Sequence, residues 1–106
     1  MRILIIFLLF VSCSAVSETS NEKIAILSVT IREYGLGEMM YVKVRNDSNT
    51  TKTFQVEMIL QDKDGIPYDK GIEVVRNLAP GETAITDRYF DKISGAVGAA
   101  RIKKIY

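Results

Sequence analysis

The sequence contains no histidine, no tryptophan and only one cysteine, Cys13. Without histidine the chain lacks the usual side chain for general acid–base catalysis near neutral pH. A single cysteine cannot form a disulfide within the chain, and it excludes a Cys/His zinc site. No spacing of carboxylates, or of serine and lysine, indicates another catalytic group. We therefore expect a protein that is not an enzyme and needs no cofactor.

An excess of charge of one sign is also missing. The chain has 14 Lys and Arg against 13 Asp and Glu, and removal of the first twelve residues takes away Arg2 and leaves 13 of each sign. A neutral domain has no overall electrostatic attraction to nucleic acid. We therefore expect no nucleic-acid partner.

Apolar residues are concentrated at the start of the chain, with 13 among the first 16 residues and 37 among the remaining 90. Arg2 precedes nine consecutive apolar residues, Ile3 to Val11, and small residues follow. This order of positive, apolar and small residues is typical of a secretory signal peptide. The apolar run is also shorter than the roughly 20 residues that span a bilayer. We predict that residues 1–12 are a signal peptide.

The cysteine lies directly after this segment. Phe10-Val11-Ser12-Cys13 resembles the lipobox of bacterial lipoproteins, in which the cysteine becomes the lipidated first residue of the mature chain, although Phe10 stands where leucine is usual. Two alternatives are ordinary cleavage after Ser17, which would discard Cys13, and an uncleaved anchor. A lone free thiol is unusual in an oxidising compartment. We therefore favour lipidation of Cys13 and attachment to a membrane through it.

The lipobox resemblance also implies a location. We expect residues 13–23 to form the lipidated cysteine and a flexible tether, because this segment is polar and rich in Ser and Thr. The protein would be lipid-anchored in the cell envelope. Ser14, where an aspartate would retain the chain at the inner membrane, implies the outer membrane or its periplasmic face in a host with two membranes. The alternative is a soluble secreted or periplasmic protein.

Apolar and polar residues alternate from Ile24 onward, as in half-buried β-strands. Shorter strands are expected over residues 71–76, 83–89 and 101–106, with Gly95 to Ala100 as a flexible connection before the last one. We predict an all-β domain over residues 24–106, a single small immunoglobulin-like antiparallel β-sandwich of six to seven strands. The residues expected to face one core are Leu27, Val29 and Ile31, then Met40, Val42 and Val44, then Phe54, Val56, Met58 and Leu60.

Residues 24–106 resemble the FxLYD-type domains, which are small immunoglobulin-like modules of exported and membrane-attached bacterial proteins. The resemblance implies the same fold, but it carries no catalytic residues. Met58 and Gln61 depart from the family pattern, which has Phe and Tyr at these positions. The matching positions are Val44, Asn46, Ser48, Leu60, Asp62, Gly65, Leu78, Pro80, Gly81 and Glu82.

Two pairs of residues are candidates for a partner surface. Tyr41 and Ile59 are expected on the outward faces of neighbouring strands, where such side chains bind partners or cover strand edges. Arg101 and Lys103 are expected to share a face of the last strand, where they would reach lipid phosphates near the anchor. The alternative, which we favour, is that they protect an edge strand from aggregation. This strand is also our candidate for pairing with an extended peptide.

Two loops have weaker ligand signals. Asp62, Asp64 and Asp69 are weak candidates for a metal site, but Gly65 comes too early for a calcium loop of the EF-hand kind. We interpret this segment as a tight turn. Asn46-Asp-Ser48 and Asn49-Thr-Thr51 are two N-glycosylation sequons in one loop, and we interpret them instead as a turn stabilised by its own side chains.

These features predict a small envelope-anchored bacterial lipoprotein with a non-enzymatic β-sandwich domain for interaction or accessory roles. Its partners would be the membrane, through Cys13, and a protein of the cell envelope. The alternative is a secreted soluble β-sandwich module that binds a carbohydrate or a metal ligand.

Overall fold

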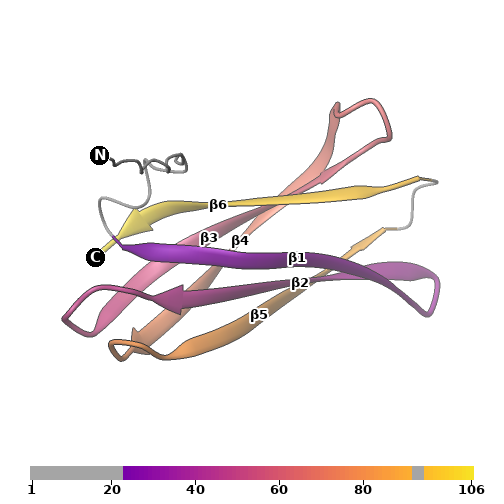
Figure 1. Ribbon diagram of the computed structural model, residues 1–106. Coiled ribbons are helices and arrows are strands. Elements are labelled where there is room, and N and C mark those ends of the chain that lie inside the picture. Colours follow the sequence, from indigo (N-terminus) through magenta and orange to yellow (C-terminus); the bar gives the residue numbers. More distant parts are fainter. Residues whose placement is uncertain (1–22, 92–94) are drawn as a thin grey trace, which may run out of the picture.

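The computed structural model describes residues 23–91 and 95–106, which form six strands and no helix (Figure 1). No helix among these residues is long and apolar enough to cross a membrane. The predicted signal peptide, Cys13 and all of the predicted tether except Lys23 lie outside the described residues. The strands are β1 (Ile24–Tyr34), β2 (Gly37–Asn46), β3 (Lys52–Gln61), β4 (Pro67–Leu78), β5 (Thr83–Asp91) and β6 (Val97–Ile105).

The strands form two three-stranded sheets, in the orders β1-β2-β5 and β4-β3-β6, and every pairing is antiparallel. Figure 1 shows the two sheets as layers, one behind the other. β1 with β2 and β3 with β4 are hairpins, whereas β2 pairs with β5 and β3 with β6 across longer stretches of sequence. Crossing connections of this kind are typical of Greek-key sandwiches. The prediction of an all-β antiparallel β-sandwich is confirmed, with six strands.

The core lies between the sheets and is supplied mainly by the two central strands. The predicted core residues of β2 and β3 are all fully buried, and this confirms their alternation: Met40, Val42, Val44, Phe54, Val56, Met58 and Leu60. Ile24, Val75, Leu78 and Phe90 complete the cluster. Burial of apolar area contributes about 25 cal/mol per Å², so these two strands hold the layers together.

The prediction for β1 was wrong at one residue. Val29 and Ile31 pack against the core as expected, but Leu27 is 39% exposed. The register of β1 against β2 shifts between Ile26 and Ser28, where an extra residue on β1 interrupts the pairing. Such a bulge changes the phase of the in–out alternation. Ile26 therefore takes the core-facing place that the sequence pattern assigned to Leu27.

One open side of the sandwich is closed by β1 and β6, which belong to different sheets. A Cβ placed on Gly98 would lie 3.0 Å from Val29 Cγ1 and 3.1 Å from Ile31 Cδ1. The missing side chain of Gly98 therefore lets the two edges approach. The prediction that Gly95 to Ala100 is a connection was wrong, because β6 begins at Val97 rather than Arg101. Small residues here allow close packing of strands.

The opposite open side is bridged by polar side chains. Arg88 of β5 donates a hydrogen bond from Nη1 to Oε2 of Glu73 on β4, at 2.7 Å. The Arg88 side chain occupies the space that a Cβ on Gly71 would need. The guanidinium carbon also lies 6.0 Å from the centre of the Phe90 ring. Arg88 thus connects the two sheets and covers one end of the core.

Candidate functional site

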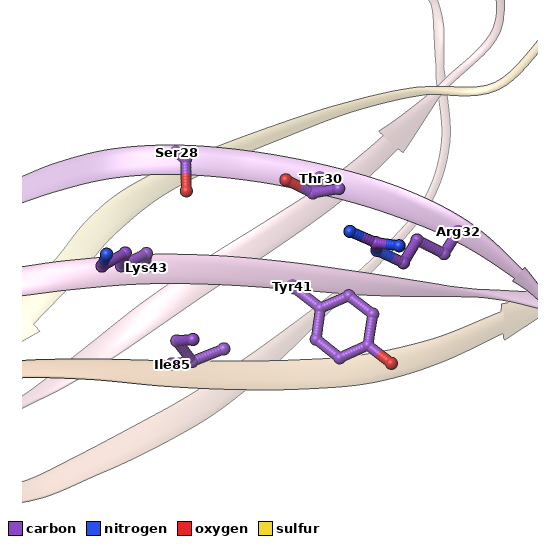
Figure 2. Close-up of a pocket in the computed structure, with 6 residues that line it drawn as sticks. All are labelled: Ser28, Thr30, Arg32, Tyr41, Lys43 and Ile85. Carbon is purple, nitrogen blue, oxygen red and sulfur yellow. The ribbon is translucent and has the colours of Figure 1, made fainter.

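A shallow hollow of about 290 Å³ lies on the outer face of sheet β1-β2-β5 (Figure 2). Antiparallel partners point to the same face of a sheet, and here the register places Thr30 beside Tyr41, and Lys43 beside both Ser28 and Ile85. These are the outward positions that alternate with core residues. The lining comes from all three strands of the sheet: Ser28, Thr30, Arg32, Tyr41, Lys43 and Ile85.

The hollow carries two cations that have no ion pair among the described residues, Arg32 and Lys43. By contrast Arg45, the next outward residue of β2, donates two hydrogen bonds to Asp47. The hydrogen bond from Arg45 holds the pKa of Asp47 below its usual value. Arg45 is therefore committed to a neighbour within the domain, while the charges of Arg32 and Lys43 face solvent.

The geometry of the hollow suits an anionic, oxygen-rich group. Figure 2 shows Arg32 and Tyr41 at one end and Lys43 at the other, with the hydroxyl groups of Ser28 and Thr30 on the β1 side. A guanidinium offers five N–H donors and an ammonium three, and both prefer carboxylate or phosphate acceptors. Ile85 is 64% exposed and adds an apolar contact beside them. The hollow can therefore bind a carboxylate-bearing ligand by charge and shape together.

The outer face of the other sheet contains a buried carboxylate. Glu57 lies on the middle strand, and its side chain is only 2% exposed. Arg101 of β6 donates from Nε to Oε1 of Glu57 at 2.5 Å, and the ammonium of Lys103 lies 4.0 Å from Oε2. The hydrogen bond from Arg101 lowers the pKa of Glu57, and the charges of Arg101, Lys103 and Lys70 lower it further, against the effect of burial.

Cations flank β3 on both sides of this face. All of them are exposed, and they far outnumber the one carboxylate: Lys70 and Arg76 on β4, and Arg101, Lys103 and Lys104 on β6. Between them lie Ile72 and Val74, which are 40% and 39% exposed, and the half-buried Ile59. We call this set of cations and apolar residues the basic face.

The structure separates two of the predicted partner residues. Tyr41 lies on β2 and Ile59 on β3, and these strands belong to different sheets, so the two side chains are on opposite outer faces. The prediction of neighbouring strands with one shared surface was wrong, because alternation assigns a face but not a sheet. Arg101 and Lys103 do lie together, and β6 is an edge strand as expected.

The three candidate metal ligands do not converge. Asp62 Oδ1 accepts hydrogen bonds from the backbone N–H groups of Asp64 and Ile66, and Asp69 Oδ1 accepts one from Lys70. The described part of the chain holds no group of three His, Cys, Asp or Glu that could bind a metal ion. Asp62 therefore closes the turn between β3 and β4, which confirms the interpretation as a tight turn.

The asparagine of the first sequon, Asn46, is structural, whereas Asn49 of the second sequon is exposed. Asn46 is fully buried, and its Nδ2 donates to the carbonyl oxygens of Thr50 and Leu78, at 2.9 and 2.7 Å. Its Oδ1 accepts from the backbone N–H and the hydroxyl of Ser48. A buried amide with its donors engaged is not available to a glycosyl carrier in the folded domain. For Asn46 and Ser48 the interpretation as a turn held by its own side chains is confirmed.

Sequence reasoning missed most of the hollow and the buried state of Glu57. Of the residues that line the hollow, only Tyr41 was a candidate. The alternation of polar and apolar residues could have indicated the hollow, because it places four polar side chains of β1 and β2 outward: Ser28, Thr30, Arg32 and Lys43. Glu57 occupies an outward position and carries no sign of burial in the sequence, because side chains of the adjacent strands cover it.

Comparisons with known proteins found no matching family model, no matching curated protein and no matching solved structure. The site is therefore interpreted from its own geometry.

Proposed function

We propose that this protein is a non-enzymatic binding module, held at the bacterial cell envelope by a lipid on Cys13, that binds a protein partner through the hollow of sheet β1-β2-β5. The observation that carries the proposal is the pair of cations, Arg32 and Lys43, which face solvent without an ion pair among the described residues. The natural ligand for such a pair is a segment that presents carboxylate side chains.

The composition of the hollow supports a protein partner. Tyrosine and arginine contribute most to binding at protein interfaces, and Tyr41 and Arg32 lie together at one end of the hollow. All lining residues stand on strands of one sheet rather than on loops, so little backbone freedom remains to be lost on binding. The hydroxyl groups of Ser28 and Thr30 add hydrogen bonds that orient the ligand.

The envelope location rests on the sequence. The lipobox-like Phe10-Val11-Ser12-Cys13 and the resemblance of residues 24–106 to FxLYD-type domains both support an exported, membrane-attached protein. Stable attachment needs more than one acyl chain, and a diacylated Cys13 meets that condition. A Cys13→Ser variant should lose acyl labelling and leave the membrane fraction. An unsubstituted mature chain that starts at Glu18 without acyl mass, measured by intact-mass spectrometry, would refute the anchor.

The binding hypothesis is tested by cross-linking in the envelope. A photoreactive amino acid at position 85, inside the hollow, should capture one discrete protein, and the same residue at position 63, in the exposed turn between β3 and β4, should not. Neutralising Arg32 and Lys43 together by Gln should remove the cross-link while the domain stays folded. A cross-link of unchanged intensity in the doubly neutralised chain would refute the proposal.

A further inference from the structure

The two outer faces of the sandwich differ in charge although the expected mature chain has equal numbers of cations and anions. The basic face has five cations and one carboxylate, Glu57, for a net charge of +4. The outer face of sheet β1-β2-β5 has three cations, Arg32, Lys43 and Arg45, and two carboxylates, Asp87 and Asp91, for a net charge of +1. Positive charge is thus concentrated on one side of the domain.

The basic face also has apolar residues at its centre. Ile72 lies beside Glu57 and Val74 beside Gln55 in the register of β4 against β3, and both side chains are about two-fifths exposed. At the end of β6 the Lys104 ammonium lies 4.8 Å from the centre of the Tyr106 ring, and the Tyr106 hydroxyl accepts a hydrogen bond from Gln55. Cations around exposed apolar and aromatic side chains match the boundary between lipid headgroups and acyl chains.

The chain enters the domain at the end of the sandwich where Lys104 and Tyr106 lie. The first residue of β1, Ile24, pairs with Asn46, and the last residue of β6, Ile105, pairs with Phe54. Residues 46 and 54 flank the loop between β2 and β3, so the start of β1 and the end of β6 lie together at one end of the sandwich (Figure 1). A membrane tether that enters there brings Lys104 and Tyr106 near the bilayer first.

We propose that the basic face lies flat against the anionic headgroups of a phospholipid membrane and turns the hollow of the opposite sheet away from the bilayer. The contact needs no lipidation, and only its orientation toward the anchored membrane rests on the proposed function. A membrane is favoured over an acidic protein because the cations are spread over both flanking strands. The hollow described above lies on the other sheet. Cations spread in this way complement the negative charge that anionic headgroups distribute over a membrane surface.

The test uses tryptophan fluorescence, because the full chain has no tryptophan and a single one reports only its own site. Val74→Trp places the reporter on the basic face, and Ile85→Trp places a matched reporter on the opposite face. Each full chain is mixed with vesicles of phosphatidylcholine alone or of phosphatidylcholine with phosphatidylglycerol, with bromine-labelled acyl chains as quenchers. We expect a blue shift and quenching for Val74→Trp only with phosphatidylglycerol, weakened by salt, and neither change for Ile85→Trp.

Two double variants separate the effect of cations on the basic face from the effect of net charge. Arg76→Gln with Lys104→Gln removes two cations from the basic face without touching the ion pairs of Glu57. Arg32→Gln with Lys43→Gln makes the same change in net charge on the opposite face. Because each cation near an anionic surface adds about a fivefold factor, the first pair should weaken partition into the anionic vesicles roughly 30-fold. The second pair should leave it close to that of the unsubstituted chain.

Several outcomes would overturn the inference. They are an unshifted Val74→Trp spectrum in anionic vesicles, the same shift in neutral vesicles, equal losses from both pairs, or a preference of the basic face for poly-glutamate over vesicles. Urea unfolding of each variant confirms that it is folded. The vesicles contain no protein, so failure here leaves the cross-link of the hollow untouched. Loss of that cross-link by the Arg32 and Lys43 pair likewise leaves the vesicle result standing.

Discussion

Arg101 donates a 2.5 Å hydrogen bond to Glu57 from the neighbouring strand, although the Arg101 side chain is 63% exposed and that of Glu57 only 2%. The exposed partner therefore keeps the buried carboxylate charged. The pKa of Glu57 is lowered in the folded chain, so the unfolded chain binds a proton at Glu57 more readily. The stabilisation is fully present above the unfolded pKa of about 4.3, and it is lost as the pH falls through the folded value.

Glu57→Gln should make the free energy of unfolding less dependent on pH in acid. Without this carboxylate, the free energy of unfolding should fall less steeply below about pH 4.3, as measured by urea unfolding over a pH series. Asp87→Asn, which removes an exposed carboxylate of the opposite sheet, is the matched control and should leave the slope nearly unchanged. Equal slopes for Glu57→Gln and the unsubstituted chain would show that the ion pair does not couple stability to pH.

Phe54→Ala should lower the free energy of unfolding by about 3–5 kcal/mol, because the ring is fully buried at the centre of a core without disulfides. A small domain has about 5–15 kcal/mol in total, so the variant should be largely unfolded near 37 °C. Ile85→Ala, at a 64% exposed position, should change stability by no more than about 0.5 kcal/mol. A loss below about 1 kcal/mol for Phe54→Ala in urea would contradict the core assignment.

Asn46→Ala should destabilise the domain by about 2–3 kcal/mol, because it removes the donor to the buried Leu78 carbonyl and the acceptor for Ser48. The exposed Asn49 of the same loop provides the control, and Asn49→Ala should be nearly neutral. Thermal unfolding of both variants checks the expectation. Similar midpoints for the two would mean that the Asn46 hydrogen bonds add nothing to the loop.

Gly98→Val should cost about 1–3 kcal/mol, because the added methyl groups would collide with Val29 and Ile31 of the facing strand. Ala99→Val adds the same bulk one position along β6, where the side chain points outward beside Ile59, and it should be tolerated. Denaturant unfolding compares the two. If Gly98→Val is as stable as Ala99→Val, the two edges do not pack closely at this point.

The alternation of apolar residues predicted the core of β2 and β3 residue by residue, because both strands are central and the extra residues at the register shifts lie on their partner strands. It failed at Leu27, where a bulge in β1 changes the phase of the alternation. A bulge depends on how a strand pairs, and that information is not carried by one strand's own pattern. The start of β6 was missed for a related reason: Gly98 is small because it faces β1, whereas in the sequence a small residue resembles a loop signal.

The candidate site was less accessible to sequence reasoning than the fold. Tyr41 was identified as outward, but its neighbours in the hollow come from β1 and β5, and only the sheet order β1-β2-β5 brings them together. Ile59 was grouped with Tyr41 because alternation does not reveal which sheet a strand joins. Arg101 and Lys103 were grouped correctly, since both reach Glu57, although Lys103 is an extra residue where the pairing of β6 with β3 shifts.

Each sheet is completed by a strand from late in the sequence, since β5 closes against β2 and β6 against β3. The hairpins β1–β2 and β3–β4 appear first during synthesis, and an isolated two-stranded hairpin is marginally stable in water. Pairing across some forty residues must also pay the entropy of closing a long loop before it gains contacts. A chain synthesised from its N-terminus therefore stays open until β6 is available, and for the export that we propose an open chain is the form that a narrow channel can pass.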